Sequence, residues 1–306
     1  MVSATDTFNP AAAEGGPSFA QRWLRSTLRF VRHYPLGAFG AAFAIVLVAM
    51  AIYPSGFATA DPNFQILGDR FQGPSAAHYF GTDALGRDMY SRIIFGARTS
   101  ILVGFGVVIV SAVLSTSLGV ISGYFGGWFD VLFQRLVDIG IALPGLIFII
   151  LVVTSIRDRL PFGGTTAIIL SVGVLISIRL SRVIRSGAIA VREEQYVEAA
   201  RALGATATRI MSRHVVPNVF ALVLVSASIE VGAAILIESA LSFLGYGIQP
   251  PQASWGRMLN DAREELIRSP HMAIFPGLAI FLTVYSFNML GDAIRDKLDP
   301  RLRGSR

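Results

Sequence analysis

The sequence contains no cysteine and few charged residues. Without cysteine, the chain forms neither a disulfide framework nor a thiolate metal site. Only 15% of its residues are charged, against roughly a quarter in an ordinary soluble domain, whereas 53% are hydrophobic. This balance is too apolar for a soluble globular domain. It indicates a protein that crosses a membrane several times, because several stretches approach the roughly 20 apolar residues that one crossing requires.

The sequence also lacks the patterns of two common kinds of functional site. No segment matches the phosphate-binding pattern Gly-x-x-x-x-Gly-Lys-Ser/Thr, so any nucleotide hydrolysis must be carried out by another chain. No residues form a convincing catalytic set, which argues against an intramembrane enzyme. The four histidines are scattered, with no pair at the spacing of metal ligands. We therefore expect a protein that is not an enzyme and that binds no cofactor or metal itself.

Six apolar stretches predict six transmembrane helices and an all-α membrane protein. Their approximate ranges are 36–53, 99–119, 131–155, 165–180, 218–237 and 272–290. If the N-terminus lies inside the cell, the cytoplasmic segments hold most of the 26 Lys and Arg residues. Basic residues concentrate on the cytoplasmic side of membrane proteins, so this distribution favours cytoplasmic N- and C-termini. It also accounts for the net charge of +6 better than binding to nucleic acid does.

The predicted topology divides the chain into four parts. They are a cytoplasmic tail and helix at 1–35, the first span with an outer segment at 36–98, a core of five spans at 99–291, and a cytoplasmic tail at 292–306. The first part is expected to begin disordered and to end in a basic amphipathic helix, which either lies on membrane lipid or is a simple positive flank. The core contains a polar cytoplasmic loop at 192–218 and a second outer segment at 238–271.

The cytoplasmic loop is the longest strongly helical polar stretch of the chain. Ala, Glu, Arg and Leu favour a helix over residues 196–203, and Gly204 suits the turn that ends it. The residues predicted to share one face of this helix are Val197, Ala200 and Leu203. A second helical pattern covers residues 206–214 and is expected to stop before Pro217. The loop is therefore predicted to be a short helix-turn-helix between two spans.

The same loop carries the most specific motif of the sequence. Residues 198–200, Glu-Ala-Ala, are followed by Gly204 and Pro217 at a spacing that resembles the EAA loop of ABC importer permeases. In that family the loop is the cytoplasmic coupling helix that docks on the ATPase subunit. His214 departs from the general pattern, but residues 213–218 are similar to the version found in the dipeptide, oligopeptide and nickel branch.

Further motifs of that branch occur in the family's order between residues 81 and 301. They are Gly-Thr-Asp-x-Leu-Gly-Arg-Asp at 81–88, Gly-Tyr-Phe-Gly-Gly-Trp at 123–128, Ala-Leu-Pro at 142–144, Leu-Ser-Phe-Leu-Gly at 241–245, Phe-Pro-Gly at 275–277, Asn-Met-Leu-Gly-Asp at 288–292 and Leu-Asp-Pro-Arg at 298–301. Several independent motifs in one order make the resemblance more specific than any one of them. The first and last resemble the second of the two permease subunits in such systems.

The resemblance implies a type I ABC importer permease with six transmembrane helices in the cytoplasmic (inner) membrane of a bacterium. It implies import of a solute that the sequence does not identify: dipeptides, oligopeptides, nickel chelates and glycosides all fit the family's scaffold, with peptides favoured. The implied partners are a homologous permease subunit in a heterodimer, two ABC ATPase subunits that bind ATP and magnesium, and an extracytoplasmic substrate-binding protein. The residues implied in coupling to the ATPases are Tyr196, Glu198, Ala199, Ala200, Arg201, Gly204 and Pro217.

Glu230 is the one acidic residue well inside a predicted span, and Ala234 shares its helical face. An ionisable side chain within a membrane is costly and usually functional. Glu230 either faces the translocation path, where it attracts a peptide ammonium group, or pairs with an arginine of a neighbouring helix. In an ion-gradient-driven secondary transporter it would be the ion site, although no clear internal repeat supports that alternative. Glu238, at the outer end of the same span, is expected to be interfacial.

Asp83, Arg87 and Asp88 form a charged group in the first outer segment. They fit either a metal or acid-base cluster or a structural network of ion pairs and turns. The structural network is favoured, because no second convergent group is present. A metal role for the outward-facing His78 and His271 stays open, although ordinary interfacial histidines are favoured.

Overall fold

A computed structural model of the chain describes residues 28–298, which form helices and loops without a β-strand. The longer helices are α2 (Pro35–Ile52), α3 (Met89–Phe125), α4 (Gly127–Ala142), α5 (Gly145–Ile156), α6 (Gly164–Arg192), α7 (Gln195–Ala202), α9 (Val216–Phe243) and α11 (His271–Leu298). The shorter ones are η2 (Pro54–Gly56), η3 (Leu67–Asp69), η4 (Arg157–Arg159), α8 (Ala207–Ile210), η5 (Met211–Val215) and α10 (Trp255–Asp261). The expected disordered tail, most of the amphipathic helix and the chain beyond Leu298 lie outside the described residues.

The spans confirm the predicted all-α membrane architecture with one correction. Within the described residues, five helices are long and apolar enough to cross a membrane: α2, α3, α6, the continuous helix of α8, η5 and α9, and α11. The pair α4 and α5 makes a sixth span only if it is counted as one unit, because it is bent by 94°. The prediction of one helix over residues 131–155 is therefore wrong. Pro144 disfavours the helical conformation at Leu143, whose ψ is 138°, and α4 ends there.

Two helices continue well beyond their predicted spans. α3 begins at Met89, whereas the span was expected from residue 99, and α6 ends at Arg192, whereas its span was expected to end at residue 180. Hydropathy shows which part of a helix can lie in lipid, but it does not show where the helix ends. Both helices therefore extend beyond the apolar stretch, through residues that lie outside the membrane. Asp88 caps α3 by accepting a hydrogen bond from the backbone N–H of Ser91 at 2.9 Å.

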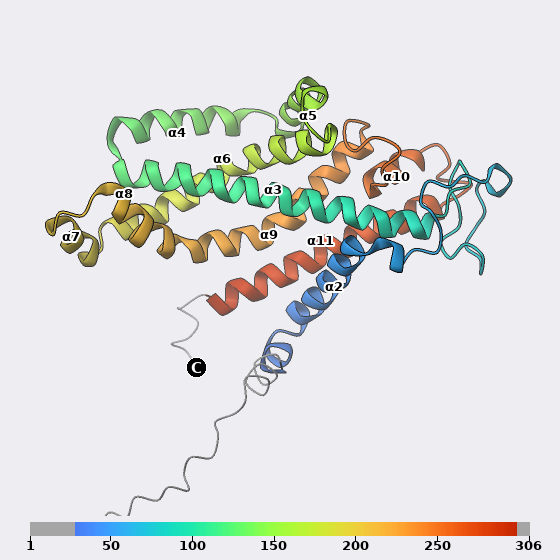
Figure 1. Ribbon diagram of the computed structural model, residues 1–306, viewed down its shortest axis with the longest axis horizontal. Helices are drawn as coiled ribbons and strands as arrows, with labels where there is room; N and C mark the ends of the chain where they lie inside the picture. The colour runs from blue at the N-terminus through green and yellow to red at the C-terminus, as the bar shows by residue number, and fades with distance from the viewer. Residues whose placement is uncertain (1–27, 299–306) are drawn as a thin grey trace, which may run out of the picture.

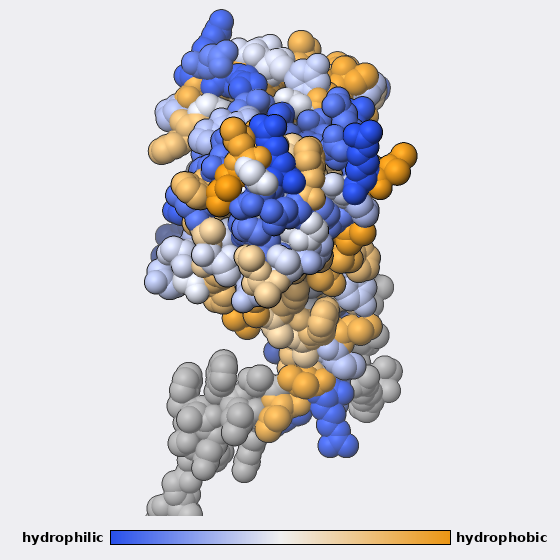
Figure 2. Space-filling model, turned by 90° about the vertical axis from the view of Figure 1, so that its right-hand side faces the viewer, coloured by the Kyte–Doolittle hydropathy of each residue, from blue (hydrophilic) through white to orange (hydrophobic). Residues whose placement is uncertain are grey.

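The two polar parts of the chain lie at opposite ends of the molecule. Figure 1 shows α3, α6 and α9 side by side along its length, with α7 and α8 at one end and α10 near the other. α2 packs against α11. Figure 2 views the end that carries the outer segments, where hydrophilic residues cover much of the surface. This arrangement separates the cytoplasmic loop from both outer segments, as the predicted topology requires.

The contact between α3 and α6 depends on two glycines of α3. A Cβ atom at Gly119 would lie 2.7 Å from the carbonyl oxygen of Ser181, and one at Gly123 would lie 2.8 Å from that of Arg185. These distances are shorter than ordinary van der Waals contact, so only glycine allows the two helices to approach this closely. The spacing Gly-x-x-x-Gly commonly supports such close approach in membranes.

Replacing Gly119 by leucine is therefore expected to destabilise the fold by about 1–3 kcal/mol or more, because the new side chain forces α3 and α6 apart. Denaturant unfolding of the purified chain in detergent measures the effect. Gly277→Leu in α11 is the matched control, since a Cβ atom there meets nothing within 4 Å. Equal destabilisation by the two substitutions would show that the α3–α6 contact is not the cause.

Candidate functional site

The cytoplasmic loop begins with α7, which is anchored by one buried side chain. The helix predicted at residues 196–203 is confirmed, with each boundary shifted by one residue. Val197 is fully buried in a cluster that includes Ile184 of α6 and Ile210 of α8. Gly204 has a φ of +81°, a left-handed conformation that glycine adopts without strain, and the chain turns there. α7 is thus fixed against the ends of the long helices.

The opposite face of α7 is exposed to solvent. Leu203 is 89% exposed and Tyr196 is 44% exposed. The other residues of the predicted coupling set that are exposed are Glu198, Ala199, Arg201, Gly204 and Pro217, whereas Ala200 is half-buried. The prediction that Leu203 shares a face with Val197 and Ala200 is wrong, because α7 ends at Ala202 and Leu203 lies in the turn. Together, exposed aromatic, aliphatic and charged groups make a face suited to contact with another protein.

Tyr196 also connects α7 to the start of α9. Its ring lies 5.9 Å from the ring of His214, measured between centroids. The side-chain amide of Asn218 donates a hydrogen bond to the Tyr196 hydroxyl at 3.2 Å. The histidine that departs from the general family pattern is therefore a packing partner of one of the predicted coupling residues.

A second set of contacts connects the loop to the end of α3. Arg192 donates hydrogen bonds from Nη1 to the carbonyl oxygens of Gly123 at 3.3 Å and Tyr124 at 3.2 Å. The guanidinium of Arg201 lies 6.0 Å from the centre of the Tyr124 ring, within reach of a cation–π interaction. The loop thus contacts α3 as well as α9.

The second helix of the loop runs without a break into the next span. The helix is continuous from Ala207 to Phe243, so the prediction that it stops before Pro217 is wrong. The π-helical turn η5 lets proline, which has no backbone N–H, join the helix. The side chain of Asn218 donates to the carbonyl oxygen of His214 at 2.7 Å, which gives this carbonyl a partner. One helix therefore reaches from the cytoplasmic loop to the outer end of the molecule.

Sequence reasoning missed an ion pair at the cytoplasmic end. Arg185 of α6 donates from Nε to Asp130 of α4 at 2.6 Å, and the hydroxyl of Ser122 of α3 donates to the same carboxyl group. Arg185 counted in the sequence only as one of many basic residues on the cytoplasmic side. The signal for its partner was an acid, Asp130, in the first turn of a helix that begins at the two glycines Gly126 and Gly127.

The two residues predicted for the translocation path differ in exposure. Glu230 of α9 is half-buried, and Arg179 of α6 lies close enough to act on its charge. Within the described residues, no hydrogen bond or ion pair joins Glu230 to another side chain. Ala234 is fully buried in a core cluster that includes Val172 of α6. Of these two residues, only Glu230 has a side chain that is partly exposed on the surface of this chain.

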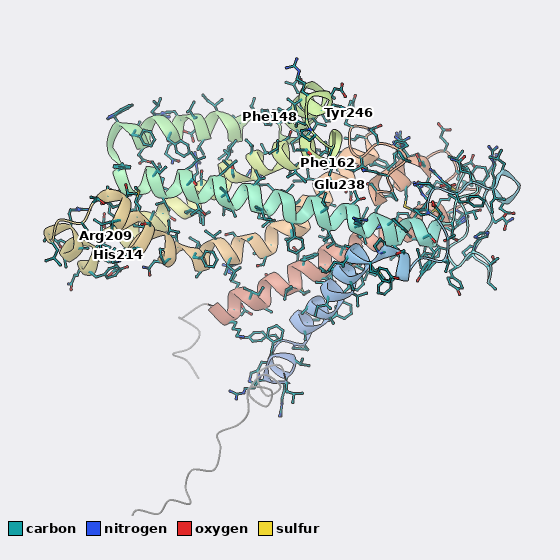
Figure 3. All side chains as sticks on the ribbon, in the orientation of Figure 1. Phe148, Phe162, Arg209, His214, Glu238 and Tyr246 are labelled. Carbon is teal, nitrogen blue, oxygen red and sulfur yellow. The ribbon has the colours of Figure 1, made fainter. Side chains whose placement is uncertain are left out.

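Glu238, near the outer end of α9, is fully buried, so the expected interfacial position is wrong. Its carboxyl group accepts hydrogen bonds from the hydroxyls of Ser242 at 2.7 Å and Ser254 at 2.8 Å. Ser254 immediately precedes α10, and these bonds replace the water that an interfacial acid would bind. Figure 3 shows Glu238 toward the outer end of the molecule and His214 at the opposite end.

The charged group of the first outer segment is the predicted structural network. Arg87 donates from Nε to Asp83 at 2.7 Å, and Asp88 caps α3. His78 lies 3.0 Å from Asp88, and Nε2 of His271 lies 3.2 Å from the carbonyl oxygen of Thr82. Within the part of the chain that the structure describes, no group of three or more His, Asp or Glu side chains is arranged to hold a metal ion.

Comparison with known proteins assigns the chain to a family. Residues 115–304 match the family described as "Binding-protein-dependent transport system inner membrane component". The chain belongs to this family. It is 38% identical to the glutathione transport system permease protein GsiD of Pectobacterium atrosepticum over 92% of each chain. It is 37% identical to the proteins of the same name from Escherichia coli O6:K15:H31 and Shigella boydii, over 92% of this chain and 91% of theirs.

Family membership confirms the main interpretation of the sequence. The chain is a permease subunit of an ABC importer of the peptide and nickel branch, and it resides in the inner membrane. Its relatives are permease subunits and not enzymes, and the family works with ATPase subunits and a substrate-binding protein. Membership also sets aside the alternative of an ion-gradient-driven transporter.

Proposed function

We propose that this chain forms one half of the pathway by which an ATP-driven importer carries small peptides, paired with a homologous permease subunit in a heterodimer. Support comes from relatives named for glutathione transport, which match the chain over almost its whole length. Glutathione is itself a small peptide. We infer that ATP and magnesium bind on the partner ATPase subunits and not on this chain.

The coupling role rests on one observation: α7 is held to the rest of the protein by the buried side chain of Val197, while its opposite face is exposed. Val197 fixes the helix, while Glu198, Ala199 and Leu203 remain accessible to a partner. A partner ATPase that moves on binding ATP shifts α7 as a rigid lever, because a short docked helix moves without unfolding. The contacts of Tyr196 and Arg201 pass this shift to α9 and α3. Allosteric coupling requires such an element, one that both ends of the protein can bias.

Reconstitution tests the substrate class directly. The chain is assembled in proteoliposomes with its homologous permease, the two ATPases and the substrate-binding protein. ATP-dependent uptake is then measured for radiolabelled glutathione, a dipeptide, an oligopeptide and a nickel chelate. We expect uptake of one or more of the peptides and none of the nickel chelate. Uptake of nickel alone would contradict the peptide assignment while leaving the importer assignment intact.

A further inference from the structure

A cavity of about 380 Å³ lies between the first outer segment and the segment around α10. The charged side chains that line it are Asp83, Arg87, Arg92, Arg257 and Asp261. The cavity lies at the opposite end of the molecule from α7. The predicted topology places this end on the extracytoplasmic side of the membrane. The volume of the cavity falls within the roughly 300–1,000 Å³ of small-molecule sites.

The charges around the cavity do not balance. Arg87 pairs with Asp83 at 2.7 Å and with Asp261 at 3.7 Å. Arg92 lies 3.7 Å from the same Asp83, and Arg257 lies 3.0 Å from the same Asp261. Three guanidinium groups thus share two carboxylates. One positive charge is left over, in a cavity whose deepest charged residue, Arg92, is 2% exposed.

Hydrogen bonding at the cavity is also incomplete. Arg92 is 2% exposed, and its Nη1 donates to the carbonyl oxygen of Pro62 at 3.1 Å, but its Nε has no hydrogen-bond partner. The Nε of Arg257, although close to Asp261, likewise makes no hydrogen bond. A buried donor without a partner is unfavourable, and two of them at one cavity mark this cluster of charges as unusual for a purely structural network.

We propose that this cavity binds a carboxylate group of the peptide as it enters the permease from the outside. The walls carry three guanidinium groups and one excess positive charge, which suits a carboxylate, and arginine forks match the geometry of its two oxygens. The volume exceeds what a single side-chain carboxylate from a docked protein would fill, which favours a small solute. This inference rests on the proposed import of peptides and adds a subsite to it.

Arg257→Gln is the primary test, because Arg257 is partly exposed and its loss leaves the buried Arg92 in place. Arg268→Gln is the matched control, since it removes the same charge from an exposed position of the same outer segment. Binding of radiolabelled glutathione is measured by equilibrium dialysis on the permease–ATPase assembly in nanodiscs, without the substrate-binding protein. Docking of the substrate-binding protein is measured separately on the same assemblies.

We expect Arg257→Gln to weaken glutathione binding about tenfold or more, and Arg268→Gln to leave it unchanged. The diethyl ester of glutathione, which has no free carboxylate, should bind neither wild type nor variant. Arg92→Lys, which keeps the charge but removes the planar guanidinium fork, should weaken binding as well in assemblies that still co-purify with the ATPases.

Three results would overturn the inference. They are equal glutathione binding by Arg257→Gln and Arg268→Gln, no binding of glutathione by the wild-type assembly, and weaker docking of the substrate-binding protein with glutathione binding intact. The last result would assign the cavity to a carboxylate of that protein. Failure of the proposed function is a separate outcome, namely that the complete wild-type importer carries no peptide.

Discussion

An Ala199→Trp variant is expected to lose nearly all ATP-driven uptake while still inserting in the membrane. Ala199 lies on the exposed face of α7, away from the buried Val197, so the larger side chain leaves the fold of the loop intact. It does, however, occupy the surface that the partner ATPase needs. Steric exclusion from a docking interface costs several kcal/mol, so we expect a loss of about 100-fold or more in uptake.

The measurement is uptake in proteoliposomes, together with co-purification of the ATPase subunits. Ala77→Trp is the matched control, because the same substitution is made at an exposed alanine of the outer segment. It should leave both uptake and ATPase binding near wild-type values. Normal ATPase binding and normal uptake by Ala199→Trp would show that α7 does not meet the ATPase.

The sequence was informative where a local pattern determines the structure. Helix propensity and a glycine were enough to locate α7, because both act within a few residues. The Asp83 and Arg87 network was also recognisable, since its partners are four residues apart. The coupling residues were selected by resemblance, and the exposure of most of them agrees with that choice without testing it.

The failures of prediction have two physical causes. The break at Leu143 and the continuous helix through Pro217 show that a proline acts according to its neighbours: one ends α4, while the other is accommodated by a π-helical turn. The contacts of Glu238 and Arg185 join residues distant in the chain, which no local spacing reveals. The cavity at Arg92 escaped notice for the same reason, because its charges come from two separate outer segments.

Glu238 is expected to be the residue that holds the second outer segment on the end of α9. Besides the bonds from Ser242 and Ser254, the Ser242 hydroxyl oxygen accepts a hydrogen bond from the backbone N–H of Ile248 at 3.0 Å. One carboxyl group therefore fixes both the turn after α9 and the residue that immediately precedes α10. Because α9 continues to the cytoplasmic loop, this contact is where movement of the loop would reach the outer segment.

Replacing Glu238 by alanine should destabilise the protein by roughly 2–4 kcal/mol, because it opens a cavity and leaves buried hydroxyls without an acceptor. Glu238→Gln keeps the shape and one acceptor oxygen and should cost less than half as much. Denaturant unfolding in detergent measures both values. Glu264→Ala, which removes an exposed acid from the same outer segment, is the control and should have little effect.

The position of the outer segment can be followed separately from stability. The chain has no cysteine, so Ala253→Cys introduces a single thiol at a position that is 6% exposed, next to Ser254. A membrane-impermeant maleimide should label it slowly when Glu238 is present and several times faster when Glu238→Ala is added, because the segment then detaches from α9. Equal labelling in the two backgrounds would show that other contacts hold the segment without Glu238, such as the hydrogen bonds from Asn260 to the Phe243 carbonyl and from Thr99 to the Ala253 carbonyl. In that case the packing of α10 on α9, and not the Glu238 carboxyl group, would connect the outer segment to the helix that reaches the cytoplasmic loop.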